Sequence, residues 1–240
     1  MTSWDDQVES WTVHARSAES DPFFWEINLP VVMELLPPPP CQVLDLGAGE
    51  GRLTRAMTAR GYTVFSVERS LGMLRALQLA GEDGNRALLN GDACALPIKP
   101  GSVDCVVSLM VLMSIADARS AVREAARVLR GGGLAVFAVL HPLVTCGRMG
   151  DDGDLRVSDY GKCSLPAPRL VQRSVLLTYE HFHRPVGTYL TWSIDAGLTL
   201  EAVVEPVPGA EQIAAHPRFR RWEGVPNMLL WTARRRAPRP

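Results

Sequence analysis

Three glycines in one short segment have the spacing of a ligand-binding loop. The segment VLDLGAGEGRL, residues 43–53, carries Gly47, Gly49 and Gly51 between a short apolar stretch and a region with helical spacing. Because glycine has no side chain, a ligand can approach the backbone closely there, and the N–H groups that open a helix favour anionic or polar groups. The spacing therefore predicts a small-molecule site at this turn.

Two common glycine loops fit the segment poorly. A nicotinamide-binding loop needs a third glycine where the helix packs on the strand, and this chain has Arg52 at that position. A triphosphate-binding loop needs lysine and then serine or threonine after the last glycine, whereas Gly51 is followed by Arg52 and Leu53. Neither a nicotinamide dinucleotide nor a nucleoside triphosphate is therefore the favoured ligand.

Three acidic residues stand at the ends of successive predicted strands. Asp45 precedes the glycine loop, Glu68 ends the next strand, and Asp92 follows the third. A carboxylate at the second position can accept hydrogen bonds from both hydroxyls of an unphosphorylated ribose, and one at the third can accept a bond from an adenine amino group. Each acid alone could equally cap a turn or lie on the surface, so the prediction of an adenosine-type ligand depends on their order.

The elements that would position these residues alternate between strands and helices. Strands are expected at 42–46, 63–67, about 87–90, 103–109 and 134–140, and helices at 4–20, 52–60, about 70–80 and 118–130. Such alternation is typical of a parallel sheet with helices on both faces. Farther along the chain, a strand is expected at 172–180, a helix near 186–196 and a strand at 199–205.

Taken together, these segments resemble the class I S-adenosylmethionine-dependent methyltransferases. The resemblance covers about residues 40–140 and depends on five segments in order: VLDLGAGEGR, VFSVERS, LNGDACALP, VDCVVSLMVLMSIAD and EAARVLRGGGLAVF. It implies a Rossmann-like α/β fold whose seven-stranded, mostly parallel sheet has the order 3-2-1-4-5-7-6, with the last strand antiparallel. It also implies an enzyme that uses S-adenosyl-L-methionine and releases S-adenosyl-L-homocysteine.

The resemblance further implies a set of cofactor contacts. Those at the methionine part of the cofactor would be Asp45, Gly47, Ala48 and Gly49, those at the ribose and adenine Glu68, Arg69, Met73, Asp92 and Ala93, and the one at the far side of the cofactor Leu109. The stretch from Trp11 to Arg16 is similar to the N-terminal WxxxxR stretch of a subgroup of small bacterial members. Arg16 would then pair with the cofactor carboxylate, although it could also be a surface charge.

One methyltransferase domain is expected to span residues 1–240. Its expected parts are an N-terminal helical cap at 1–40, a cofactor-binding core at 41–140, a substrate-side insertion at 141–170, C-terminal strands and a helix at 171–233, and a tail at 234–240. The four prolines at 37–40 cannot continue a helix, so they separate the cap from the core.

Histidines are the candidate bases of the reaction. Methyl transfer is an in-line displacement, so the protein mainly aligns the reacting atoms, and a base is needed only for weakly acidic nucleophiles. His141 follows the strand predicted at 134–140, which would bring it to the same sheet edge as the glycine loop, unless it only caps that strand. His183 opens the next helix and is the second candidate. His181 and His183 lack a third ligand at a suitable spacing, so no metal site is expected.

Composition narrows the class of substrate. The chain is 47% hydrophobic and 21% charged with a formal net charge of −1, which is ordinary for a globular protein and gives no basic excess for nucleic acid. No apolar run reaches the roughly 20 residues of a membrane helix, and the five cysteines never form a CxxC pair, so a cytoplasmic location is expected.

We therefore expect a small-molecule acceptor, such as a bacterial secondary metabolite, and neither nucleic acid nor a membrane as partner. Two other functions stay open. One is a cyclase that uses the same cofactor site in natural-product biosynthesis, for example to form a cyclopropane. The other is a non-enzymatic protein that only binds the cofactor or a partner. The sequence does not indicate the oligomeric state.

Overall fold

Seven strands form the central sheet of the computed structural model, which describes residues 4–81, 85–150, 153–163, 170–172, 175–177 and 181–237. The strands are β1 (Gln42–Leu46), β2 (Thr63–Glu68), β3 (Asn85–Asn90), β4 (Val103–Leu109), β5 (Leu129–Leu140), β10 (Leu198–Val204) and β11 (Met228–Arg235). Their order in the sheet is β10-β11-β5-β4-β1-β2-β3.

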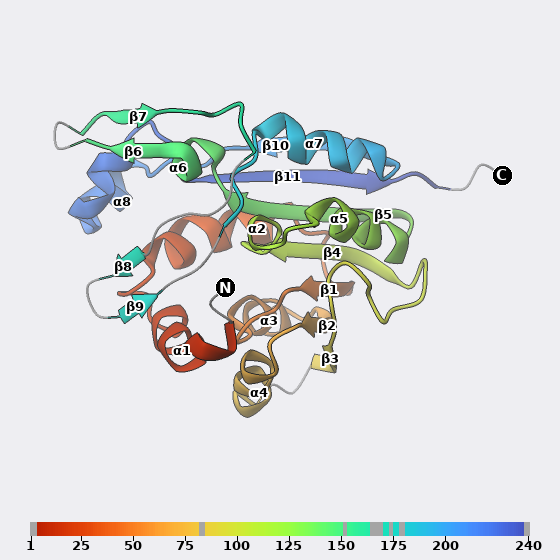
Figure 1. Ribbon diagram of the computed structural model, residues 1–240. Helices are drawn as coiled ribbons and strands as arrows, with labels where there is room; N and C mark the ends of the chain where they lie inside the picture. The colour runs from red at the N-terminus through yellow and green to blue at the C-terminus, as the bar shows by residue number, and fades with distance from the viewer. Residues whose placement is uncertain are drawn as a thin grey trace.

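This order confirms the predicted topology. With β10 and β11 as the sixth and seventh strands of the sheet, it is 3-2-1-4-5-7-6. β11 runs antiparallel to both β5 and β10, and the arrow of β11 in Figure 1 points against that of β5. The other pairs are parallel, so the carboxyl ends of β1, β2 and β4 meet at one edge of the sheet.

Helices cover both faces of the sheet and bury two apolar clusters. On one face, α5 (Ala118–Val128) and α7 (Val186–Asp195) pack on the cluster that contains Phe137 and Trp231. On the other face, α2 (Leu29–Leu35) and α3 (Arg52–Thr58) pack on the cluster around Val43 and Val107. A parallel sheet is stable when both of its faces are covered in this way, and these two layers fix where the strand ends lie.

Side-chain hydrogen bonds cap the start of the two α-helices that come next after β2 and β4. Ser70 Oγ accepts a bond from the Met73 N–H at the start of α4 (Leu71–Leu79), and Asp117 accepts from the Ser120 N–H at the start of α5. Such caps satisfy N–H groups that have no partner within the helix. They fix the turns that follow β2 and β4, both of which border the carboxyl edge of the sheet.

The N-terminal segment differs from the single helix expected at 4–20. It consists of the 3-10 helix η1 (Trp4–Gln7), the α-helix α1 (Val8–Arg16) and, after a turn, the π-helix η2 (Phe23–Asn28) that leads into α2. Asp21 accepts a hydrogen bond from the Phe24 N–H at the start of η2. The chain therefore turns at this aspartate and crosses the carboxyl edge of the sheet.

Elements between the fifth strand and the last one also differ in detail from the expectation. The insertion contains α6 (Pro142–Cys146) and the antiparallel pair β6 (Gly147–Met149) and β7 (Leu155–Val157), while its residues 164–169 lie outside the described part. The strand expected at 172–180 overlaps a second short pair, β8 (Leu170–Gln172) and β9 (Val175–Leu177), and residues 178–180 are not described.

Two elements were not expected at all, α8 (Ala210–Ala215) and the 3-10 helix η4 (Pro217–Trp222). They connect β10 to β11. Among the helices of the described ranges, none combines the length and the apolar character that a membrane span requires.

We predict that Trp231→Ala lowers the free energy of unfolding by about 3–5 kcal/mol, as is usual when a large aromatic side chain is removed from a core. Trp231 is fully buried, its ring stacks on Phe137 at 5.1 Å, and its Nε1 donates to Ser193 Oγ at 2.9 Å. Urea unfolding followed by circular dichroism measures the change. The matched control is Leu79→Ala, because Leu79 is 87% exposed and its loss should change stability by less than about 0.5 kcal/mol.

Candidate functional site

A cavity of about 570 Å³ opens at the carboxyl edge of the sheet. The strand order reverses between β1 and β4, and in open α/β sheets such a reversal creates a crevice in which ligands bind. Ten of the eleven residues predicted to contact a cofactor line this cavity: Asp45, Gly47, Ala48, Gly49, Glu68, Arg69, Met73, Asp92, Ala93 and Leu109. The structure therefore brings nearly the whole predicted set to one place.

The glycine loop forms the floor of the cavity. Gly47 has φ +75°, and a Cβ atom built on it would lie 2.5 Å from Val111 Cγ2, so no larger residue fits there. Gly49 has φ +59°, which is strained for other residues, and the nearest atom to its own built Cβ is Trp11 Nε1 at 3.8 Å. Packing against Val111 thus requires glycine at position 47. At position 49 the positive φ favours glycine, although the space around its Cβ position is open.

Glu68 is held in a fixed orientation at the end of β2. Its Oε2 accepts a hydrogen bond from the Gly49 N–H at 2.9 Å, and its Oε1 accepts from the Ser70 N–H at 2.8 Å. Burial raises the pKa of Glu68, and these backbone hydrogen bonds act in the opposite direction. The carboxylate keeps lone pairs for further donors, which suits it to bind a pair of hydroxyl groups.

Asp45 lies beneath the loop and is almost completely buried. Thr54 Oγ1 donates to Asp45 Oδ2 at 2.6 Å, and Thr54 lies 3.0 Å from Ser66 Oγ. Burial, reinforced by the nearby charge of Glu68, raises the pKa of Asp45 to about 7. A carboxyl group that is only partly ionised at neutral pH therefore lines the cavity.

At the end of β3, Asp92 lines the cavity and also orders its own turn. Its Oδ1 accepts a bond from the Cys94 N–H at 2.8 Å. The turn-capping role that the sequence left open for Asp92 is therefore present, and it fixes the carboxylate beside Ala93 in the cavity wall. Asn90 Nδ2 donates to the backbone oxygens of Glu68 and Arg69 and so ties β3 to the turn after β2.

Arg16 does not line the cavity. Its Nε donates to Glu50 Oε2 at 2.7 Å and its Nη2 to the Ala76 oxygen at 3.1 Å. The Glu50 side chain is buried and also accepts two bonds from Arg55. Because a buried carboxylate needs such partners, Arg16 joins the N-terminal segment to the glycine loop from outside the cavity.

The two candidate bases, His141 and His183, also lie outside the set of cavity-lining residues. His141 Nε2 lies 2.6 Å from Glu205 Oε1, and its Nδ1 accepts a bond from the Leu143 N–H, which caps α6. His183 Nδ1 lies 2.6 Å from Thr145 Oγ1, and its Nε2 lies 2.9 Å from the backbone carbonyl oxygen of Tyr160. Both rings are engaged in hydrogen bonds that fasten the insertion to its neighbours.

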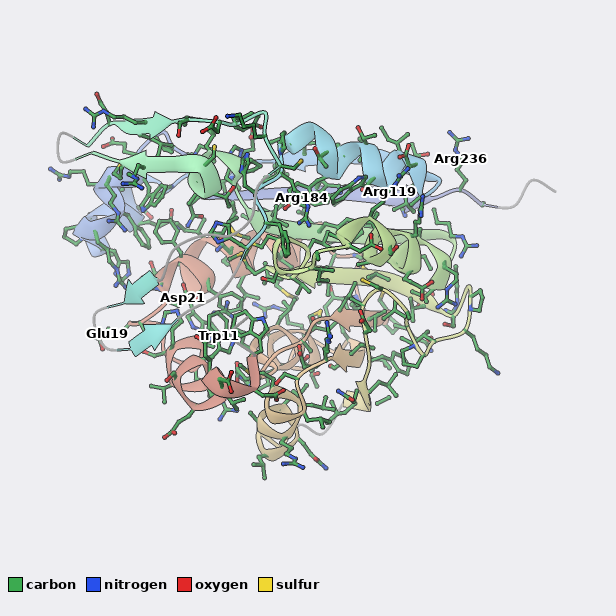
Figure 2. All side chains as sticks on the ribbon, in the orientation of Figure 1. Trp11, Glu19, Asp21, Arg119, Arg184 and Arg236 are labelled. Carbon is green, nitrogen blue, oxygen red and sulfur yellow. The ribbon has the colours of Figure 1, made fainter. Side chains whose placement is uncertain are left out.

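A charged cluster that the sequence analysis did not single out lines the cavity instead. His14 Nε2 lies 3.6 Å from Asp21 Oδ2, and Arg52 Nη1 donates to the same oxygen at 2.7 Å. The Arg52 guanidinium lies 3.7 Å from the centroid of the Phe24 ring and 5.1 Å from that of Trp11. Figure 2 labels Trp11 and Asp21 on the N-terminal segment, close to one another.

The charge state of this cluster follows from its contacts. Burial alone would raise the pKa of Asp21, but the contact with His14 and the positive charge of Arg52 outweigh it and lower that pKa well below its usual range. Asp21 is therefore ionised at neutral pH. Its anion lies beside the His14 ring and orients the imidazole. A search for polar residues one helical turn from Trp11 would have found His14.

Aromatic residues from distant parts of the chain form the roof of the cavity. Phe23 packs on Phe219 at 4.2 Å between ring centroids and meets the edge of Trp222 at 6.0 Å. Phe23, Phe24, Phe182 and Trp222 line the cavity. The neighbouring Trp25 does not line the cavity.

Comparison with known proteins agrees with this geometry. Residues 44–137 match the family model described as a methyltransferase domain. The chain is 30% identical over 186 residues to a demethylmenaquinone methyltransferase of Corynebacterium urealyticum, a match that covers 77% of this chain and 68% of that protein. The chain belongs to the class I S-adenosylmethionine-dependent methyltransferases.

Other members of the family match a smaller part of their own length. A malonyl-[acyl-carrier protein] O-methyltransferase of Methylococcus capsulatus is 39% identical over 107 residues, which is 43% of this chain and 38% of that protein. The first relatives are thus matched over less than half of their length. Membership of the family therefore does not identify the methyl acceptor of this methyltransferase.

Solved structures of the family share the whole fold. An S-adenosylmethionine-dependent methyltransferase of Mesorhizobium loti superposes with a TM-score of 0.75 at 25% identity and covers 92% of this chain and 99% of its own. The [4+2]-cyclase SpnF has the same fold with a TM-score of 0.59 at 16% identity over 88% of this chain and 80% of its own. The fold is therefore compatible with more than one chemistry.

We predict that Asp45 makes this methyltransferase-family protein less stable as the pH rises toward 7. The folded-state pKa of about 7 lies above the ordinary value of 3.8, so between these values the folded protein holds a proton that the unfolded chain has lost. This stabilising contribution is complete below about pH 4 and is lost as the pH rises through about 7. Relative to Asp45→Asn, the wild type should lose about 1.4 kcal/mol of unfolding free energy per pH unit in this interval.

Urea unfolding of both proteins at half-unit steps from pH 4.5 to pH 7.5 measures the difference. Asparagine keeps the size of the side chain and can still hydrogen-bond Thr54, so the comparison isolates the titration. Stability curves that run parallel over the interval would show that Asp45 is not protonated in the folded state.

Proposed function

We propose that this protein binds S-adenosyl-L-methionine in the cavity and transfers its methyl group to a small-molecule acceptor. The observation that carries the proposal is the position of Glu68, whose carboxylate is aimed at the cavity by the Gly49 and Ser70 N–H groups. When bound, the cofactor supplies a methyl group on a positively charged sulfur, and S-adenosyl-L-homocysteine is the product.

The residues of this chain have separate tasks in that proposal. Glu68 accepts hydrogen bonds from the ribose hydroxyls, and Met73 with Asp92 and Ala93 surrounds the adenine. The glycine loop and Asp45 receive the methionine part, where a carboxylate suits the positive charges of the ligand. All of these groups line one cavity, so the protein can align donor and acceptor without supplying a covalent group of its own.

An apolar small molecule is the proposed acceptor, such as a bacterial secondary metabolite. Apart from the proposed cofactor contacts, the cavity is lined by phenylalanine, tryptophan and methionine side chains that include Phe23, Phe24, Met110, Met113, Phe182 and Trp222. The names of two relatives specify different acceptors, a demethylmenaquinone in one and a malonyl-[acyl-carrier protein] in the other. The acceptor must therefore be inferred from this chain's own cavity.

His14 replaces His141 and His183 in the proposal as the group that can take a proton from the acceptor. It lies in the cavity wall and faces an ionised partner, Asp21, at 3.6 Å. His141 and His183 bind Glu205 and Thr145 instead and serve to position the insertion. A base is needed only if the acceptor nucleophile is weakly acidic, such as a hydroxyl group.

Ring closure by the same fold is the alternative chemistry. It is favoured only by the likeness to a cyclase structure, which shows the fold alone. The mass of the product separates these reactions. Transfer adds one methyl group to the acceptor, a [4+2] ring closure leaves the mass of the substrate unchanged, and ring closure on a cofactor-derived adduct expels a leaving group.

We predict that S-adenosyl-L-methionine and S-adenosyl-L-homocysteine bind with micromolar affinity and that Glu68→Ala weakens both by about 100-fold or more. Two charge-assisted hydrogen bonds to the ribose would be lost, each of roughly 1.5–3 kcal/mol. Gly49→Val should also abolish binding, because valine is strained at φ +59° and its methyl groups would fill the space in front of Trp11.

Calorimetric titration of the purified proteins measures these affinities. Glu201→Ala is the matched control, since Glu201 lies on β10 and pairs with Arg234 away from the cavity. A folded wild-type protein that binds neither compound would refute the proposed function.

We predict that His14→Gln lowers kcat about 100-fold at neutral pH for an acceptor identified by a product-mass screen. The acidic limb of the pH–rate profile should disappear, while the affinity for S-adenosyl-L-homocysteine stays within about twofold. His141→Gln is the comparison variant and should lower thermal stability without removing that limb. The same profile in the wild type and in His14→Gln would rule out His14 as the base.

A further inference from the structure

Two asparagines in the cavity wall have buried amide oxygens without a hydrogen-bond partner. Asn28 ends η2 and is only 6% exposed, and Asn227 immediately precedes β11. Both residues line the cavity, and Oδ1 of each is buried and accepts no hydrogen bond within the described part of the chain. Buried amide oxygens are normally paired, so these two require an explanation. Ser114 Oγ is a third cavity-lining side-chain atom that is buried and has no hydrogen-bond partner among the described residues.

The two amides belong to the same part of the cavity. The residues that follow them, Leu29 and Met228, pack in one apolar cluster together with Phe24. Asn227 directly precedes β11, and β5 and β4 lie between β11 and the strands β1 and β2 that lead to the glycine loop and Glu68. Neither asparagine belongs to the set of residues proposed to bind the cofactor.

The backbone holds at least one of these residues firmly in place. The Asn227 carbonyl oxygen accepts a bond from the His141 N–H at 2.8 Å. The side-chain amide is thus presented by an anchored backbone, and rotation about its last torsion can turn its oxygen toward a ligand. Buried atoms without a partner also include the hydroxyls of Thr58 and Ser108, which differ from these amides in that neither residue lines the cavity.

We propose that Asn28 and Asn227 bind the methyl acceptor and determine its class, an apolar ring-containing molecule with hydroxyl or amine groups that donate hydrogen bonds to the two amide oxygens. This inference rests on the proposed function, which it extends from the cofactor to the acceptor. The aromatic roof, with Phe24 and Trp222, covers the apolar body of the acceptor. A site with fixed hydrogen-bond acceptors discriminates strongly against ligand analogues that lack a hydrogen-bond donor, because the amide oxygens then stay unpaired.

The test compares two probes of the same ring system, 2-naphthol, which has a hydroxyl donor, and 2-methoxynaphthalene, which has none. Fluorescence titrations are run on the wild type, Asn28→Leu and Asn227→Leu, each with saturating S-adenosyl-L-homocysteine and each without it. The wild type should bind 2-naphthol about tenfold more tightly than the methoxy analogue, as expected for a gained hydrogen bond. In each variant this ratio should fall to within about twofold of unity.

A structural role for the asparagines predicts different results. Under the proposal, leucine removes an unpaired polar group from an apolar environment, so the melting temperature of each ligand-free variant should be unchanged or raised. Asn28→Ala and Asn227→Ala repeat the probe titration with a smaller side chain. Thr58→Val is the control that removes a buried orphan hydroxyl outside the cavity, and its probe ratio should equal that of the wild type.

Several outcomes would overturn the proposal: an equal affinity of the wild type for both probes, no binding of 2-naphthol, an unchanged ratio in the variants, or a lowered melting temperature in both leucine variants. Failure of S-adenosyl-L-homocysteine to bind would instead refute the proposed function. The titrations without it still test the asparagine site, so the two failures are distinguishable.

Discussion

The buried guanidinium of Arg52 joins the glycine loop to the N-terminal segment that lines the cavity. Arg52 is the first residue of α3, directly after the glycine loop, and its guanidinium is paired with Asp21 and enclosed by the rings of Trp11 and Phe24. A buried charge is tolerated only with such a partner, so the N-terminal segment must cross the sheet edge at this point. The third glycine expected of a nicotinamide site is absent because its position serves this contact.

The proposed cofactor half and the proposed acceptor half of the cavity differ in how the sequence specifies them. Asp45, the glycine loop and Glu68 each belong to a strand end and the turn beside it, so their types and spacing along the chain predicted both the fold and their convergence. The matched family region, residues 44–137, contains this half. The roof and the two asparagines lie outside it, and their positions depend on packing between segments far apart in sequence, which no local pattern reports.

The predicted positions of His141 and Arg16 differ from the observed ones for the same reason. His141 was expected at the correct sheet edge and follows β5 as predicted, yet Glu205 and the α6 backbone hold its ring away from the cavity. Arg16 was expected at a ligand carboxylate, and Glu50 already satisfies it. Each side chain is held by a glutamate, Glu205 or Glu50, whose position cannot be predicted from the pattern of strands and helices alone. Conversely, His14 is on a predicted helix, but its role depends on Asp21 beyond the end of that helix.

The roof also bears on how the chain folds during synthesis. Gln212 Nε2 donates to the backbone carbonyl oxygen of Glu26, a contact between residues 186 positions apart, and Phe23 packs on Phe219. The strands and the glycine loop of the cofactor half leave a ribosome long before η4 does. The aromatic face of η2 therefore stays without its partner until residues 217–222 have also emerged. Long-range contacts of this kind form late, and the interval before they form is when an exposed apolar segment is most open to chaperones or to aggregation.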